Sequence, residues 1–243
     1  MTFTAILSAL AEEQQGLLEL LQQPQKINHA GRDFWQGTLH GQPVVLALSR
    51  IGKVAAATTA TALIERFKVS RIVFTGVAGG LGAGVQVGDV VVATEFVQHD
   101  LDASPIFPRY EVPLYGQSRF ACDAALTALL LAAGRASLQS LALLPAVAVH
   151  HGLIASGDRF VSGAQEAQTL RESLQGQGHA VLAVEMEGAA VAQVCFDYGL
   201  PFAAVRTISD RADDQAHVDF PVFVRDVASL YAQAMVRHLL QSL

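Results

Sequence analysis

The architecture of this chain follows from one stretch, Val181-Leu182-Ala183-Val184-Glu185-Met186-Glu187-Gly188-Ala189-Ala190. A short apolar run is followed by two carboxylates, Glu185 and Glu187, and then by an alanine-rich segment with the composition of a helix. Such an apolar run is typical of a strand buried on both faces of a parallel sheet. Unpaired carboxylates are costly there, and parallel sheets bind ligands beyond the carboxyl ends of their strands. The pattern predicts either a ligand site at this strand end or acids that cap the following helix.

The same alternation of strand and helix continues along all 243 residues, of which 51% are hydrophobic and 16% charged. This balance suits a buried sheet covered by helices. Strands are predicted at residues 3–9, 34–39, 43–49, 71–75, 89–97, 146–154, 180–184 and 202–208. Helices are predicted at residues 11–22, 52–67, 119–133, 164–175, 188–198 and 220–240. With no repeat or linker between them, the sequence predicts one α/β domain over residues 1–243.

Composition and charge favour a small molecule as the ligand. The formal charge is −6 and basic residues are scattered, so we expect no nucleic-acid partner. No uninterrupted apolar run approaches the ~20 residues of a membrane span, and the N-terminus lacks the basic region of a signal peptide. Cys122 and Cys195 lie far apart and outside any C-x-x-C motif, which is typical of reduced thiols. We therefore expect a cytoplasmic protein without a membrane partner.

Several motifs that carry known chemistry are incomplete. The glycine-rich segment at residues 76–84 lacks a G-x-G-x-x-G pattern, and Gly52-Lys53 lacks the earlier glycine of a Walker A loop. We interpret that segment as a turn that lets a ligand approach the backbone closely. The cluster His99-Asp100-Leu101-Asp102 has no further ligands at metal-binding spacing. No nucleophile elbow is found, and we expect neither a metal nor another cofactor.

Carboxylates follow three of the predicted strands. Glu12 and Glu13 come after the first strand, and Glu187 and Asp210 each come after a later one. Acids that converge at one edge of the sheet indicate general acid–base catalysis on a polar, uncharged substrate. Cleavage of a glycosidic bond needs one acid to protonate the leaving group and one carboxylate to activate water. Each acid could instead cap a helix, but three such acids after separate strands weaken that alternative.

These motifs together give the chain a specific resemblance. It is similar to the 5'-methylthioadenosine/S-adenosylhomocysteine nucleosidases of the nucleoside phosphorylase-I superfamily. The matching blocks are Leu7-Ser8-Ala9-Leu10-Ala11-Glu12-Glu13, Ser49-Arg50-Ile51-Gly52-Lys53-Val54-Ala55-Ala56, Thr75-Gly76-Val77-Ala78-Gly79-Gly80, Val184-Glu185-Met186-Glu187 and Ile208-Ser209-Asp210. The resemblance implies a three-layer α/β/α sandwich with a central mixed, mostly parallel sheet. It also implies a homodimer, no cofactor and a role in methionine salvage.

By the same resemblance, Asp210 is the general acid that protonates the purine N7, and Glu13 is the base that orients the attacking water. Glu187 would hold the ribose hydroxyls while Met186 packs against the sugar. The residues implied around the purine are Phe160, Val161, Ser209, Gly79, Ala78 and Val77. Those implied around the 5'-alkylthio group are Ile51, Phe220, Ala9, Leu10 and Phe107. Burial beside Glu13 and Glu187 is expected to raise the pKa of Asp210, so that it stays protonated near neutral pH.

The chain departs from the family pattern at a few positions. Val77 stands where the nucleosidases usually carry a serine that helps to hold the catalytic aspartate, so Asp210 needs another partner. Phe74 stands where the sister phosphorylases carry a phosphate-binding arginine, which favours water over phosphate as the acceptor. The open alternatives are a futalosine hydrolase, an adenosine nucleosidase and a phosphate-dependent phosphorylase. A non-catalytic nucleoside-binding protein is disfavoured because it would not need an acid and a base at one sugar.

Overall fold

The computed structural model describes residues 2–141, 147–212 and 223–243, apart from the side chains of residues 225 and 226. Its strands are β1 (Thr4–Ser8), β2 (Gln22–His29), β3 (Arg32–Leu39), β4 (Gln42–Leu48), β5 (Arg71–Gly80), β6 (Val90–Gln98), β7 (Arg119–Ala121), β8 (Val149–Ser156), β9 (Val181–Glu185) and β10 (Phe202–Asp210). Its helices are α1 (Ala11–Glu19), α2 (Lys53–Glu65), α3 (Ala124–Leu141), α4 (Ala164–Gly176), α5 (Gly188–Tyr198) and α7 (Ser229–Leu240), the last preceded by the π-helical segment η1 (Val224–Ala228).

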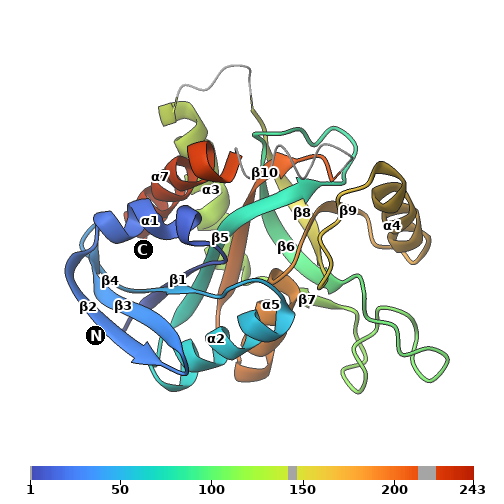
Figure 1. Cartoon of the computed structure of the whole chain (residues 1–243), viewed down its shortest axis with the longest axis horizontal. Coiled ribbons are helices and arrows are strands. Elements are labelled where there is room, and N and C mark those ends of the chain that lie inside the picture. Colours follow the sequence, from blue (N-terminus) through green and yellow to red (C-terminus); the bar gives the residue numbers. More distant parts are fainter. Residues whose placement is uncertain (1, 142–146, 213–222) are drawn as a thin grey trace.

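All the strands belong to one mixed sheet with the order β10-β6-β8-β9-β5-β1-β4-β3-β2, and β7 pairs with β6. Because β5 also pairs with β10, the strands β5, β10, β6, β8 and β9 form a closed ring. The strands β1, β4, β3 and β2 extend from this ring as an open sheet (Figure 1). Since β1 and β10 both run parallel to β5, their carboxyl ends lie at the same edge of the sheet.

Helices cover the sheet on both faces (Figure 1). On one face α1, α3 and α7 bury an aliphatic core that includes Leu17, Leu130 and Met235. On the other face α2 and α5 pack small residues such as Ala60 and Ala192 against the sheet. A third cluster joins Leu174 of α4 to the ring strands. The predicted sandwich with a central mixed sheet is confirmed.

Helix α3 is long and apolar enough to cross a membrane by length and composition, with a mean hydropathy of 1.3 over 18 residues. In the folded chain it packs against α7 and against strands β6 and β10. Leu126, Leu130 and Ala133 supply its buried side.

Most predicted elements form where expected, but three differ. The helix expected at residues 11–22 ends at Glu19, and the following residues form the edge strand β2, which includes Pro24. An edge position tolerates proline because no neighbour needs its missing N–H. The helix expected from residue 119 begins at Ala124, after the short strand β7. The glycine-rich segment does not turn at residue 76; it continues β5 to Gly80, because its backbone pairs with both β10 and β9.

Candidate active site

A cavity of about 320 Å³ opens at the shared edge of β1, β5 and β10. Its volume is that of a pocket for a small organic ligand. Predicted site residues that line it are Ala9, Leu10, Glu13, Ile51, Val77, Ala78, Gly79, Phe160, Val161, Met186, Glu187, Ser209 and Asp210. Arg159, Val184 and Glu185 line it as well. Carboxylates from three separate segments therefore meet in one pocket.

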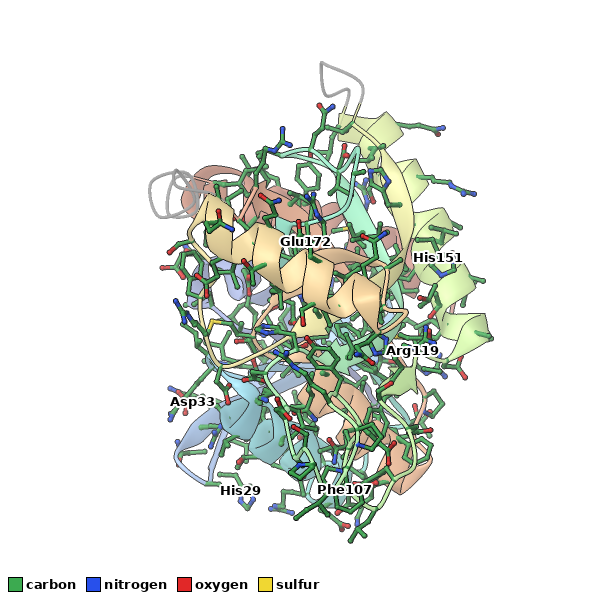
Figure 2. All side chains as sticks on the ribbon, turned by 90° about the vertical axis from the view of Figure 1, so that its right-hand side faces the viewer. His29, Asp33, Phe107, Arg119, His151 and Glu172 are labelled. Atoms are coloured by element: carbon green, nitrogen blue, oxygen red, sulfur yellow. The ribbon has the colours of Figure 1, made fainter. Side chains whose placement is uncertain are left out.

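Two predicted site residues are not among the lining residues. Phe107 lies on the long loop after β6, which extends away from the body of the molecule (Figure 1). Figure 2 shows Phe107 near the lower end of the molecule on that loop. Phe107 therefore does not contribute to the cavity of its own chain. Phe220 lies outside the described residues.

Glu13 sits in the first turn of α1 with its side chain buried. Its Oε2 accepts the N–H groups of Ala9 at 2.8 Å and Leu10 at 3.0 Å, and its Oε1 accepts the Val77 N–H at 3.1 Å. Burial raises the pKa of Glu13, while these N–H donors and the charge of Arg206 act in the opposite direction. The carboxylate is thus fixed in orientation between the first turn of α1 and strand β5.

The contacts of Glu13 also cap α1, because Ala9 and Leu10 precede the helix and their N–H groups lack partners within it. Glu13 therefore both caps a helix and lines the cavity, two roles that the sequence presented as alternatives. The neighbouring Glu12 is exposed.

Glu185, at the end of β9, and Glu187, just after it, both line the cavity but make different hydrogen bonds. Glu185 accepts the N–H groups of Glu187 and Gly188, so it caps α5. It also accepts the hydroxyl of Ser156 and pairs with Arg206 at 2.7 Å. Glu187 makes no side-chain cap of α5 and instead lines the cavity. The capping hypothesis is therefore confirmed for Glu185, whereas the ligand site at Glu187 stays a prediction.

Arg206 is a site component that the sequence analysis missed. It lies fully buried within β10, donates to the carbonyls of Phe74 and Val205, and stacks on the Phe74 ring at 4.1 Å. Its ion pair with Glu185 compensates a charge that would be very costly alone in the interior. The available signal was an arginine inside an otherwise apolar strand, because such a residue requires a buried acid nearby.

Glu187 occupies the wall of the cavity opposite a bend in the chain at Gly52. The Gly52 N–H donates to its Oε1 at 2.9 Å. Burial, and then the nearby charge of Glu185, raise the pKa of Glu187 to about 8. This raised pKa favours the protonated form of Glu187 near neutral pH. Donors from a ligand would favour its ionised form.

Asp210 ends β10 with its side chain buried. Its Oδ2 accepts the Ser209 hydroxyl at 2.8 Å, and its Oδ1 accepts the Ala212 N–H at 2.8 Å. Ser209 thus supplies a hydroxyl to Asp210 in a chain that has Val77 in place of the family's serine. A Cβ at Gly79 would lie 3.0 Å from Oδ1 of Asp210, and one at Gly76 would lie 3.0 Å from Oε1 of Glu13. The glycines of β5 therefore admit the two acids close to its backbone.

The segment that carries Phe160 and Val161 is attached to the start of α2. The Lys53 N–H donates to Oδ1 of Asp158 at 2.7 Å, and the Asp158 N–H donates to Asp100 at 2.8 Å. Lys53 also forms an ion pair with Asp100. Asp100, which belongs to the His99–Asp102 cluster, thus links the Phe160 segment to α2. Within the described ranges, no group of three metal-ligating side chains is found.

The fold and the cavity together match one class of proteins. The family model of the phosphorylase superfamily matches residues 4–241. The chain therefore belongs to the phosphorylase superfamily.

Individual relatives narrow this assignment. The chain is 37% identical over 244 residues to the 5'-methylthioadenosine/S-adenosylhomocysteine nucleosidase of Bacillus thuringiensis strain Al Hakam, covering 98% of each chain. The Neisseria meningitidis nucleosidase of the same name, in complex with methylthio-immucillin-A, matches with a TM-score of 0.88, 35% identity and full coverage of both chains. Futalosine hydrolase of Helicobacter pylori matches with a TM-score of 0.86 and 32% identity over 100% of this chain and 98% of that one. The chain belongs to the 5'-methylthioadenosine/S-adenosylhomocysteine nucleosidase family.

Proposed function

We propose that this protein hydrolyses the N-glycosidic bond of 5'-methylthioadenosine and S-adenosylhomocysteine, releasing adenine and the 5-thio-substituted ribose. The observation that carries the proposal is the convergence of Glu13, Glu187 and Asp210 on one cavity. The names of the relatives support the substrate class.

In the proposed reaction, Asp210 gives a proton to N7 of the purine, so that adenine leaves as a neutral base. Cleavage of the C–N bond develops positive charge on the ribosyl ring, which nearby carboxylates stabilise. Phe160, at the mouth of the cavity, would stack on the base, and the backbone of Val161 would contact its edge. Glu187 would accept the ribose hydroxyls, which helps it to release its proton, while Met186 packs against the sugar.

Glu13 would act as the base that orients water at the anomeric carbon and accepts its proton. Its three backbone donors leave the carboxylate little freedom to rotate, and this favours a single position for the water. Arg206 assists through its charge, which lowers the pKa values of both Glu13 and Glu187 against the effect of burial.

Water is favoured over phosphate as the acceptor because the cavity offers little to bind an anion. Among the described residues that line it, the only cationic side chain is Arg159, which is 75% exposed and paired with Glu166. Arg206, behind the cavity, is occupied by Glu185 and by backbone carbonyls. The lining carboxylates would repel a phosphate ion.

We expect adenine release from methylthioadenosine and S-adenosylhomocysteine without phosphate, and no increase when phosphate is added. The test is to incubate the protein with these two nucleosides, adenosine and futalosine, with and without phosphate, and to quantify free base, free sugar and sugar 1-phosphate. Sugar 1-phosphate as the main product would identify a phosphorylase. Turnover of futalosine alone would identify the neighbouring hydrolase activity.

We further propose a homodimer in which the loop after β6 reaches the partner's cavity. The start of α2 presents Ile51 and Val54, which are 57% and 79% exposed, and the extended loop presents Ile106 and Leu114. Phe107 would then line the partner's alkylthio pocket. Val54→Glu is expected to shift the protein toward monomer in sedimentation equilibrium and to raise the KM for methylthioadenosine. A dimer unaffected by that charge, or a wild-type monomer, would contradict this assembly.

A cytoplasmic location is proposed on the chemistry of the two cysteines. Both thiols are free, Cys195 is buried, and burial raises the pKa of Cys122 to about 12. Such thiols are unreactive and suit a reducing compartment.

A further inference from the structure

A second cavity of about 440 Å³ lies beside the proposed active site. It is bounded by α1, by the end of β4 and by the hairpin of β2 and β3. Its lining combines apolar side chains with polar and basic ones, and consists of Ala11, Gln14, Gln15, Leu18, Asn28, Gly31, Arg32, Asp33, Trp35, Leu48 and Arg50. Figure 2 shows Asp33 at the outer edge of the molecule. Neither the proposed chemistry nor the family resemblance assigns a role to this cavity.

The cavity contains two guanidinium groups that lack acidic partners. Within the described part of the chain, Arg32 and Arg50 form no ion pair and donate only to backbone carbonyls of the hairpin and of α2. The buried Nε of Arg32 has no hydrogen-bond partner among the described residues. Burial, and then the charge of Arg50, lower the pKa of Arg32, so the two cations repel each other. An anion between them would relieve that repulsion.

The one carboxylate among the lining residues, Asp33, has its pKa lowered first by its hydrogen bonds with Lys26 and Asn28, and only to a lesser degree by the charge of Arg50. Asp33 forms an ion pair with Lys26 at 2.8 Å and accepts the side-chain amide of Asn28 at 3.0 Å. Within the hairpin, the positive charge of Lys26 therefore compensates the negative charge of Asp33. The positive charge of the two guanidinium groups remains available to a ligand.

The second cavity adjoins the alkylthio end of the first. Strands β1 and β4 pair in parallel, with Ser8 opposite Leu48, and the Ser49 N–H donates to the Ser8 carbonyl at 2.8 Å. The loops that follow these two strands therefore run side by side. In each loop the two cavities are lined by adjacent residues: Leu10 and Ile51 face the first cavity, whereas Ala11 and Arg50 face the second. The paired loops thus form the boundary between the two cavities, with Leu10 and Ile51 on one side and Ala11 and Arg50 on the other.

We propose that the second cavity binds the carboxylate end of a long 5' substituent, and that it thereby favours S-adenosylhomocysteine over methylthioadenosine. This inference rests on the proposed nucleosidase activity. The homocysteine group continues beyond the sulfur and ends in an α-carboxylate, whereas the methylthio group ends at a methyl. A substituent that leaves the first cavity over the exposed side chain of Ile51 would bring its carboxylate to Arg50, with Arg32 beyond it. Guanidinium groups bind carboxylates with strong, geometrically specific hydrogen bonds.

The test compares Arg50→Gln with Arg50→Lys on three substrates: S-adenosylhomocysteine, methylthioadenosine and the carboxylate-free 5'-butylthioadenosine. Arg50 has a φ of 64°, and neither replacement is a glycine, so both variants carry the same backbone constraint. In Arg50→Gln we expect the kcat/KM ratio of S-adenosylhomocysteine to methylthioadenosine to fall about tenfold, as for the loss of a charge-assisted hydrogen bond. The ratio of the butylthio substrate to methylthioadenosine should not change. Arg50→Lys should restore part of the lost preference because it keeps the charge.

Arg135→Gln on α3 is the matched control, since it removes an exposed arginine remote from both cavities. An unchanged ratio in Arg50→Gln, or an equal loss on all three substrates, would overturn the proposal. Calorimetric titration measures the same preference as a ratio of dissociation constants. S-adenosylhomocysteine and methylthioadenosine are each titrated into the Asp210→Asn variant and into the double variant that also carries Arg50→Gln. Absence of adenine release from the wild type would contradict the proposed function, whereas the calorimetric ratio would still support or overturn this inference.

Discussion

Asp210→Asn is expected to abolish adenine release while the protein stays folded and still binds nucleosides. The substitution keeps the size of the side chain and the acceptor for the Ala212 N–H. It removes the only proton donor in our scheme for the purine leaving group, so adenine would have to depart as an anion. Loss of a general acid together with its electrostatic effect corresponds to a fall of roughly a thousandfold or more in kcat.

The measurement is single-turnover adenine release across pH, with thermal unfolding as the check on folding. Asp197→Asn is the matched control, because Asp197 is exposed on α5 and its carboxylate accepts the hydroxyl of Tyr115, outside the cavity. An Asn variant with near-normal turnover would refute the role of Asp210.

Glu13→Gln should produce a loss of comparable size for a different reason. The amide cannot accept a proton from water, and its NH₂ group faces N–H donors that now find a carboxylate oxygen. We expect kcat to fall roughly 10²–10⁴-fold, the range of general-base catalysis. The neighbouring Glu12→Gln provides a close control, since Glu12 is exposed in the same first turn of α1.

The pH dependence of Glu13 has a definite sign. Burial raises the pKa of its carboxyl, and only the ionised form can accept a proton from water. The activity of the wild type should therefore rise with pH as Glu13 ionises, at a pH above the usual range of a glutamate. Glu13→Gln should lose this rise. A rise retained in the variant would assign it to another group, such as Glu187.

The sequence was sufficient to predict most of the strands and the acids at or just beyond their carboxyl ends. Apolar runs such as residues 181–184 indicate strands clearly because a strand buried on both faces consists mainly of apolar residues. It could not predict that β10 would pair with both β5 and β6 and so close a ring, because pairing depends on twist and register between distant segments. For the same reason β7, a three-residue strand, was hidden within an apparent helix.

The chemistry of the site was predicted less completely than its location. A carboxylate after a strand can cap a helix, face a ligand or do both, and only the fold separates Glu185 from Glu187. The partner of Arg206 comes from a different strand, so the sequence order does not reveal their ion pair. The proposed roles of the lining residues remain predictions for the experiments above.

Both proposed catalytic carboxyl groups lie against the backbone of strand β5. The Val77 N–H donates to Glu13, and Gly79 lies beside Asp210. The spacing between acid and base is therefore set by a rigid sheet and not by flexible segments. The walls that would select the 5' substituent belong mainly to loops such as the one at Ile51. Exchanging these loops, in evolution or by design, should therefore change which nucleosides the protein accepts while the catalytic carboxyl groups keep their positions.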